Sequence, residues 1–290
     1  MALSRRLRVL AYHGIEDPAS FAAHLDLLVA DWHPVSATEV VADFAGEVAL
    51  PPNAVWITFD DGHRSVVETA LPLLSTRDLP ATMFVCPALV EQRLPFWWDV
   101  VEAASEQPLR TFKAMADADR RTRVAGLWEH LDRPTRTELS GRVATEAELQ
   151  RWQDAGLSLG NHTLDHPMLD RCDAAEQERQ IVEADAWLDA FVGDDRLRLF
   201  AYPNGHATPA ANELLGTLGY SLAALFDHRA NRRPVERVAS LQRPPIISRL
   251  RMSDTAAPSY LRSVLHGWRP WLSRASEARH RTVRRLVGAR

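Results

Sequence analysis

The segment Ala54-Val55-Trp56-Ile57-Thr58-Phe59-Asp60-Asp61-Gly62 joins a short apolar run to two adjacent aspartates and a glycine. The run has the length and composition of a buried β-strand. Aspartate and glycine tolerate the backbone angles of a tight turn, so Asp60-Asp61-Gly62 alone most often does no more than end such a strand. The carboxyl end of a strand is also where α/β folds build active sites. The two carboxylates are therefore candidates for chemistry as well as for a turn.

Strand-like and helix-like stretches alternate along the rest of the chain. Helix starts are predicted at Asp17, at the capping pair Thr145 and Glu148, at Asp173 and at Thr208, and a further helix over 65–76. The other predicted strands cover 9–12, 81–86, 157–160, 198–203, 221–226 and 246–248. This repeat predicts an α/β fold with parallel strands. A chain of 290 residues with 46% hydrophobic content can fill one large α/β barrel.

A pair of histidines follows one of the predicted strands, in the segment Asn161-His162-Thr163-Leu164-Asp165-His166-Pro167. Histidines four residues apart share a face on one turn of helix, and this spacing is compatible with one metal ion. Such a pair alone is a weak signal. With one aspartate it offers three ligands, and a second aspartate stays free beside them. That set is the minimum for hydrolysis by metal-activated water.

Three segments together resemble the signature motifs of the polysaccharide deacetylase family, the NodB-homology carbohydrate esterases. They are Thr58–Gly62, His162–Pro167 and Phe200–Gly205, in the family's order, and the resemblance covers roughly 9–248. It implies an irregular (β/α)7-type barrel and a hydrolase that removes an N-acetyl or other acyl group from an amino sugar in a polysaccharide or glycan precursor.

The resemblance also implies roles for individual residues. Asp60 corresponds to the catalytic base. Asp61, His162 and His166 correspond to the ligands of a divalent metal ion, usually zinc. The third motif assigns the oxyanion and substrate contacts to the N–H of Asn204 and to Tyr202.

Two departures from the family pattern concern catalysis. Ala201 stands where the family usually has an arginine that orients the base, and 242–248 lacks the usual late histidine, the general acid. His13 follows the apolar run 9–12 and resembles the Tyr-His start of poly-N-acetylglucosamine deacetylases, whose motifs are circularly permuted. This favours His13 as the acid, although a structural histidine fits the same position. His206 and His228 are weaker candidates because no motif matches them.

The segment from about 94 to 142 interrupts the strand and helix alternation and is predicted to be a helical insertion over the barrel mouth. It begins Leu94-Pro95-Phe96-Trp97-Trp98-Asp99. Exposed tryptophans stack on sugar faces, and Asp99 is a candidate to replace the missing orienting contact. The alternative is that Phe96 and Trp97 anchor the insertion to the core.

The chain is expected to divide into a barrel over 1–257 and a basic helical tail over 258–290. From Arg262 onward there are eight arginines and one acid, with Trp268 and Trp271 near the start. Such a tail fits either peripheral contact with an anionic membrane or a solvated helix.

Global composition narrows the remaining possibilities. The net charge of −4 and pI near 6.3 predict no nucleic-acid partner. Two cysteines are too few for a disulfide scaffold, and Cys86 is expected in the core. The apolar stretch after the basic N-terminus is too short for a secretory signal, so a cytoplasmic location is expected. Oligomeric state is left open.

A membrane- or nucleic-acid-binding protein that works through its basic tail is one alternative to N-deacetylation, and two alternatives that use the barrel site also remain open. One is a deformylase acting on a lipid-linked or nucleotide-linked sugar, which shares the chemistry. The other is a catalytically silent carbohydrate-binding homologue, which is motivated by Ala201 and the missing late histidine.

Overall fold

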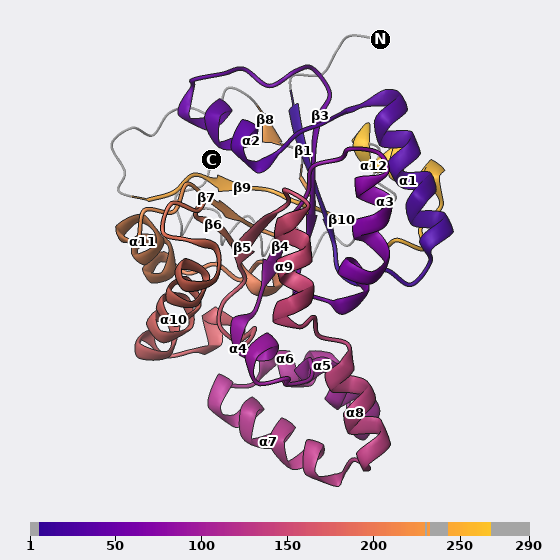
Figure 1. Cartoon of the computed structure of the whole chain (residues 1–290). Coiled ribbons are helices and arrows are strands. Elements are labelled where there is room, and N and C mark those ends of the chain that lie inside the picture. Colours follow the sequence, from indigo (N-terminus) through magenta and orange to yellow (C-terminus); the bar gives the residue numbers. More distant parts are fainter. Residues whose placement is uncertain (1–5, 230, 233–242, 268–290) are drawn as a thin grey trace.

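A computed structural model describes residues 6–229, 231–232 and 243–267. Parallel strands form the centre of the molecule and helices surround them (Figure 1). The strands are β1 (Arg6–Tyr12), β2 (His33–Pro34), β3 (Ala54–Phe59), β4 (Thr82–Val85), β5 (Ser158–Asn161), β6 (Leu199–Ala201), β7 (Leu222–Ala224), β8 (Asn231–Arg232), β9 (Ile246–Ile247) and β10 (Leu250–Arg251).

The sheet closes into a barrel through the last two of these strands. The order of pairing is β10-β1-β3-β4-β5-β6-β7-β9, and β9 and β10 are separated by only Ser248 and Arg249. This one stretch of chain pairs with β7 on one side and with β1 on the other, all in parallel. Counted as one strand, it gives seven positions around the barrel. The predicted (β/α)7-type α/β fold is confirmed.

The helices are α1 (Pro18–Asp31), α2 (Ala37–Ala45), α3 (Leu71–Ser75), α4 (Pro87–Glu91), α5 (Trp97–Ala104), α6 (Leu109–Ala114), α7 (Asp117–His130), α8 (Arg133–Gly141), α9 (Glu146–Asp154), α10 (Ala174–Val192), α11 (Pro209–Thr217) and α12 (Pro258–Leu265). The side chains of Asp17, Thr145, Asp173 and Thr208 cap α1, α9, α10 and α11, as the sequence predicts. The helix predicted over 65–76 is present, and it begins with a π-helical segment (Val66–Ala70) that continues into α3. Pro72, near the start of α3, has no N–H to continue a regular ladder.

Alternating side chains divide the core into an interior and an outer layer. Leu7 and Val9 of β1, Trp56 of β3 and Phe84 of β4 share the interior cluster. Their strand neighbours pack outward against the helices, in clusters that include Leu10, Val55, Ile57, Met83 and Val85. This alternation decides which side chains reach the lumen at the ends of the strands.

The predicted insertion forms a group of helices, α5 to α8, beyond one end of the strands (Figure 1). Phe96 is fully buried and Trp97 nearly so, which agrees with an anchoring role for these two aromatics. Trp97, Val101 and Phe112 form a small core of their own with Met168, which lies just after the histidine motif. The insertion therefore packs directly on the segment that carries the histidines.

The first helix of the predicted basic tail belongs to the outer layer of the barrel. Leu261 and Leu265 of α12 are buried in the same cluster as α1, and Arg8 donates a hydrogen bond to the Leu265 carbonyl at 2.9 Å. Residues 268–290, with Trp268 and Trp271, lie outside the described residues. Within the described part of the chain, no helix is both long enough and apolar enough to cross a membrane. The cytoplasmic location stays a prediction.

Candidate active site

The candidate residues lie at the carboxyl ends of the strands. Because alternate side chains on a strand face the same side, several of them point into the lumen of the barrel. On β3, Trp56 and Thr58 precede Asp60 at alternate positions, so Asp60 continues the row of side chains that faces the lumen. By the same alternation, Val9 of β1 leads to His13, and Ile247 of β9 leads to Arg249. Polar groups from distant parts of the sequence therefore converge at one end of the barrel.

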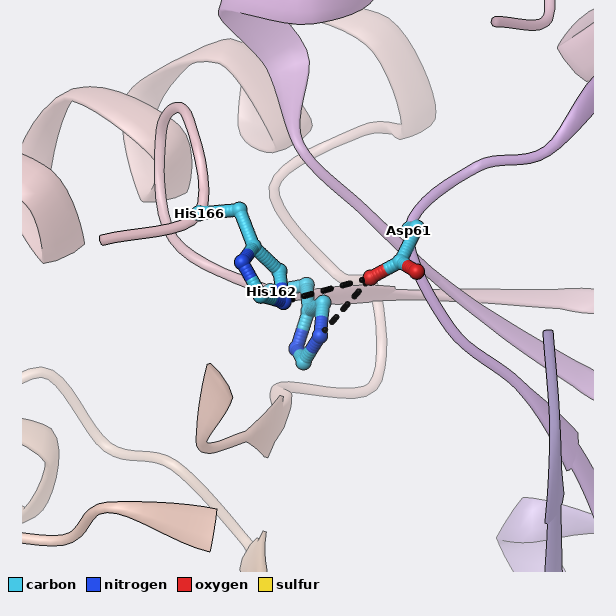
Figure 2. Close-up of side chains that lie close together, drawn as sticks. All are labelled: Asp61, His162 and His166. Atoms are coloured by element: carbon cyan, nitrogen blue, oxygen red, sulfur yellow. Dashed lines mark ion pairs between the residues drawn. The ribbon is translucent and has the colours of Figure 1, made fainter. Parts of the chain in front are cut away.

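Asp61, His162 and His166 form a compact cluster of candidate metal ligands (Figure 2). The Nε2 atom of each histidine lies 3.3 Å from Asp61 Oδ1. The three candidate ligand atoms all lie within 4.8 Å of one another, and all three residues are buried. The structure therefore brings together the three residues that the sequence grouped.

The histidine motif is a loop rather than a turn of helix. It follows β5 directly, and both Thr163 and His166 have left-handed backbone angles, with φ of 69° and 63°. Asn161 holds this loop, because its Oδ1 accepts from the Thr163 N–H at 2.7 Å. The two imidazoles face one aspartate through this irregular backbone and not through helical spacing.

The orientation of the His162 ring is fixed by a hydrogen bond on the side away from Asp61. Its Nδ1 lies 2.7 Å from the carbonyl oxygen of Ala201, and since a carbonyl only accepts, Nδ1 must carry the proton. In the neutral ring, Nε2 then presents its lone pair to Asp61. A histidine held in this way by a carbonyl is a common arrangement in metal sites.

The chemistry of the cluster fits a divalent cation. Asp61 Oδ1 is buried and has no hydrogen-bond partner within the described residues, although it faces both imidazoles. Burial alone would raise the pKa of Asp61, but the two histidines outweigh it and hold that pKa below its usual range. Burial lowers the pKa of His166 to about 3 and favours its neutral, ligating form. One carboxylate with two imidazoles is a typical donor set for zinc.

Asp60 has entirely different surroundings from its neighbour. The guanidinium of Arg249 grips its carboxylate at both oxygens, at 2.5 Å from Oδ1 and 2.8 Å from Oδ2, and Arg249 is fully buried. Burial alone would raise the pKa of Asp60, but Arg249 and His162 outweigh it and lower the pKa. Asp60 is thus held ionised beside the cluster.

Arg249 supplies the orienting contact that the third motif lacks, and the sequence analysis missed it. It lies between β9 and β10, one residue beyond the 242–248 segment in which the family pattern places a late histidine. Its Nε also donates to the Leu225 carbonyl, and its Nη1 also donates to Thr58 Oγ1. These two hydrogen bonds hold the guanidinium in place against Asp60. The signal that could have found it is alternation from Ile247, which places residue 249 in the lumen.

His13 reaches the same end of the barrel. Its ring makes a T-shaped contact with the Phe226 ring, with centroids 5.7 Å apart. The other two histidines have different surroundings. His206 pairs with Asp170 at 2.7 Å, and the ring of His228 packs at a tilt against Phe226 with centroids 5.5 Å apart.

Of the two residues predicted from the third motif, Asn204 lies at the site and Tyr202 does not. Asn204 has a left-handed backbone, with φ of 52°, and its side chain contacts Met168 and Lys113 beside the histidine loop. Tyr202 does not face the site. Alternation on β6 turns its ring outward into the α10 and α11 layer, where it is fully buried and its hydroxyl donates to Asn212. The prediction that the Tyr202 side chain contacts the substrate is therefore wrong.

Asp99 lies on α5 and pairs with Arg142 at 2.9 Å. Burial raises the pKa of Asp99, and the pairing with Arg142 offsets only part of that effect. The orienting contact to Asp60 comes from Arg249 and not from Asp99, so the sequence-based hypothesis for Asp99 is wrong on this point. Its place beside Arg142 indicates a role within the insertion.

The insertion contacts the histidine loop at several points. Trp97 Nε1 donates to the His166 carbonyl at 3.2 Å, and the ring of Trp98 packs edge-on against the His166 imidazole with centroids 4.6 Å apart. Arg121 of α7 binds both carboxylate oxygens of Asp165, at 2.5 and 2.7 Å. The insertion therefore holds the loop between the two candidate ligands.

Fold and site together define an α/β-barrel protein with a buried Asp-His-His centre at the carboxyl ends of its strands. The family model described as polysaccharide deacetylase matches residues 47–223. That match spans more than half of the chain, and the chain belongs to the polysaccharide deacetylase family. Family membership indicates a hydrolase that deacetylates carbohydrates. None of the curated proteins compared with the sequence matches it.

Solved structures of deacetylases share the fold. The Streptococcus pyogenes deacetylase PplD, in complex with acetate, is 18% identical with a TM-score of 0.64, covering 90% of this chain and 98% of its own. IcaB from Ammonifex degensii is 21% identical with a TM-score of 0.61, covering 92% and 97%. A de-N-acetylase from Aggregatibacter actinomycetemcomitans is 13% identical with a TM-score of 0.62, covering 89% and 99%. At these identities the likeness shows the barrel alone.

Proposed function

We propose that this protein is a divalent-metal-dependent N-deacetylase of amino sugars, with zinc as the metal. The observation that carries the proposal is the contrast between two adjacent carboxylates. Asp61 faces two buried imidazoles that complete a ligand set, whereas Asp60 is held by Arg249 outside that set. A ligand cluster with an ionised carboxylate beside it is what metal-assisted amide hydrolysis requires.

Asp61, His162 and His166 would hold the metal. When bound, a divalent cation polarises the acyl oxygen and makes a water molecule more acidic. Asp60 takes the proton of the attacking water. The Arg249 fork uses one acceptor position on each oxygen of Asp60, and each oxygen keeps another with which to receive that proton.

Two further groups complete the proposed reaction. The N–H of Asn204 would donate to the oxyanion that forms as water adds to the amide, a contact that can contribute about 2.7–4 kcal/mol. His13 would protonate the nitrogen as the C–N bond breaks, because an amine is a poor leaving group without a proton. The position of His13 against Phe226, at the same end of the barrel, supports this role.

Arg249 also weighs against a catalytically silent homologue. One of the two grounds for that alternative was the missing arginine of the third motif, but the buried Arg249, which lies between β9 and β10, makes a bidentate contact with Asp60. The charge partner that an ionised base needs is therefore present.

The test is acyl release from a panel of N-acetylated and N-formylated amino sugars, with and without a chelator. We expect acetate release from at least one amino sugar, loss of release on chelation, and recovery when zinc is added back. Formate release without acetate release would favour the deformylase alternative. Absence of any acyl release from the zinc-loaded protein across the panel would contradict the proposal.

A further inference from the structure

A basic side chain from the insertion reaches the mouth of the candidate active site. Lys113, on α6, is the single lysine of the whole sequence. Its Nζ donates to Asn204 Oδ1 at 2.6 Å, and Asn204 in turn contacts Met168, two residues beyond His166. The ammonium group is half-buried. The Asp61 carboxylate stabilises its charge, and the ammonium in turn disfavours protonation of His166. Lys113 therefore lies beside the place where the acyl group would be hydrolysed.

A second basic side chain reaches the same end of the barrel from the other direction. Arg251 is the last residue of β10, in register with Ala11 on β1, two residues before His13. Residues two apart on a strand face the same side, so Arg251 follows Arg249 on the lumen side but lies further toward the mouth. Its guanidinium lies over the Phe226 ring at 5.9 Å, and the same ring makes the T-shaped contact with His13.

One continuous wall connects the two cations. Asn204 binds Lys113, and the next residue, Gly205, approaches Phe226 so closely that a Cβ there would lie 2.8 Å from the Phe226 nitrogen. Arg251 covers the Phe226 ring at the far end of this wall. Burial lowers the pKa of Lys113, and the charge of Arg251 lowers it further, while the carboxylates of Asp61 and Glu102 offset part of this effect.

Among the described residues, no carboxylate forms an ion pair with Lys113 or Arg251, whereas the buried Arg120 of the same insertion pairs with Asp117. Two like charges on one wall repel each other, and the partial burial of Lys113 makes the repulsion larger than in water. A bound anion would remove this cost, and a neutral sugar would not.

We propose that Lys113 and Arg251 bind a phosphoryl group carried by the N-acylated amino sugar. This inference rests on the proposed deacetylase function and narrows its substrate class to phosphorylated sugars. Lysine offers a compact charge and arginine a planar fork, and together they match a doubly charged phosphate or a diphosphate. A nucleotide-linked sugar and a lipid-linked sugar share this chemistry.

The lone lysine permits a direct binding test. Reductive methylation with a 13C label keeps the positive charge and marks Lys113 and the N-terminal amine only, and Lys113→Met identifies the lysine signal. The zinc-loaded Asp60→Asn protein is titrated with N-acetylglucosamine 1-phosphate, with N-acetylglucosamine and with inorganic phosphate. We expect the lysine signal to shift with the sugar phosphate, at a Kd at least about tenfold below that of the neutral sugar.

Two variants sharpen this measurement. Arg251→Met should weaken binding of the sugar phosphate about tenfold, because one charged contact is lost. Arg151→Met removes an exposed arginine on the outer helix α9 and should leave the binding as it is. Equal affinity for the phosphorylated and neutral sugars, or equal binding by Arg251→Met and the parent, would overturn the inference. A shift with inorganic phosphate alone would mean an adventitious ion site, which also overturns it.

Turnover separates the failure of this inference from failure of the proposed function. We expect kcat/KM to favour phosphorylated over neutral N-acetyl sugars, and Lys113→Met and Arg251→Met each to lower that ratio about tenfold. Preference for a uridine diphosphate sugar or for a prenyl phosphate-linked sugar would identify the source. Efficient turnover of neutral sugars only would leave the deacetylase function intact and refute the phosphoryl site. No turnover at all would refute the function, while the titration still decides on phosphate binding.

Discussion

Asp60 and Asp61 are adjacent in the chain, yet their surroundings prepare them for different tasks. Asp61 faces the two imidazoles, with an oxygen that no hydrogen bond satisfies within the described residues, whereas Asp60 is gripped by a buried guanidinium. The left-handed backbone of Asp61, with φ of 74°, turns the two side chains apart. Aspartate tolerates this angle. The Asp60-Asp61-Gly62 segment therefore forms a turn and also supplies the two carboxylates of the site.

Replacing Asp60 by asparagine should separate catalysis from metal binding. The amide would keep the size of the side chain but could not accept a proton, so we expect turnover to fall on the order of 10²–10⁴-fold. Metal content, measured by atomic absorption, should equal that of the parent because Asp60 lies outside the ligand cluster. Turnover close to the parent rate would remove Asp60 from the role of base.

Arg249 should matter for folding as well as for the site. Arg249→Met leaves the buried Asp60 carboxylate without its partner, and breaking a buried pair in this way costs about 3–5 kcal/mol. Denaturant unfolding should show this loss, and Arg151→Met, an exposed arginine on α9, should show almost none. A parent-like midpoint for Arg249→Met would mean that the contact contributes little.

At the scale of elements, regular strands and capped helices could be predicted from the sequence and short elements could not. The strands β3 and β4 carry long apolar runs, and four predicted caps were confirmed. In contrast, β9 and β10 have two residues each, too few for a periodic signal, and Arg249 lies between them. The histidine loop was also beyond sequence reasoning, because its left-handed angles depend on contacts with Asn161 and the insertion.

The insertion should influence metal binding through Arg121. This residue of α7 binds both oxygens of Asp165, between the two candidate histidine ligands. We expect Arg121→Met to weaken zinc affinity about 10–100-fold, as is typical when a group that orients ligands is removed. Arg133→Met, an exposed change on the neighbouring α8, is the matched control. Competition with a chromophoric chelator measures both, and equal affinities would assign Arg121 to packing alone.

At the scale of the whole molecule, closure of the sheet brings distant segments to one end. His13, Asp60, His162 and Arg249 follow four different strands, and the barrel places all of them at the carboxyl ends. The family resemblance supplied the first three, and barrel closure through β9 and β10 supplied the fourth. The insertion then covers this end of the barrel and contributes Lys113 and Trp98.

The most direct test of this account is the zinc content of the purified protein. It is measured by inductively coupled plasma mass spectrometry after dialysis against a weak chelator. We expect about one zinc ion per chain in the parent and in Asp60→Asn, and almost none in His162→Ala or Asp61→Ala, because each loses one of three ligands. Circular dichroism checks that the variants fold. Zinc at the parent level in folded His162→Ala would contradict the assignment of the Asp61, His162 and His166 cluster as the metal site.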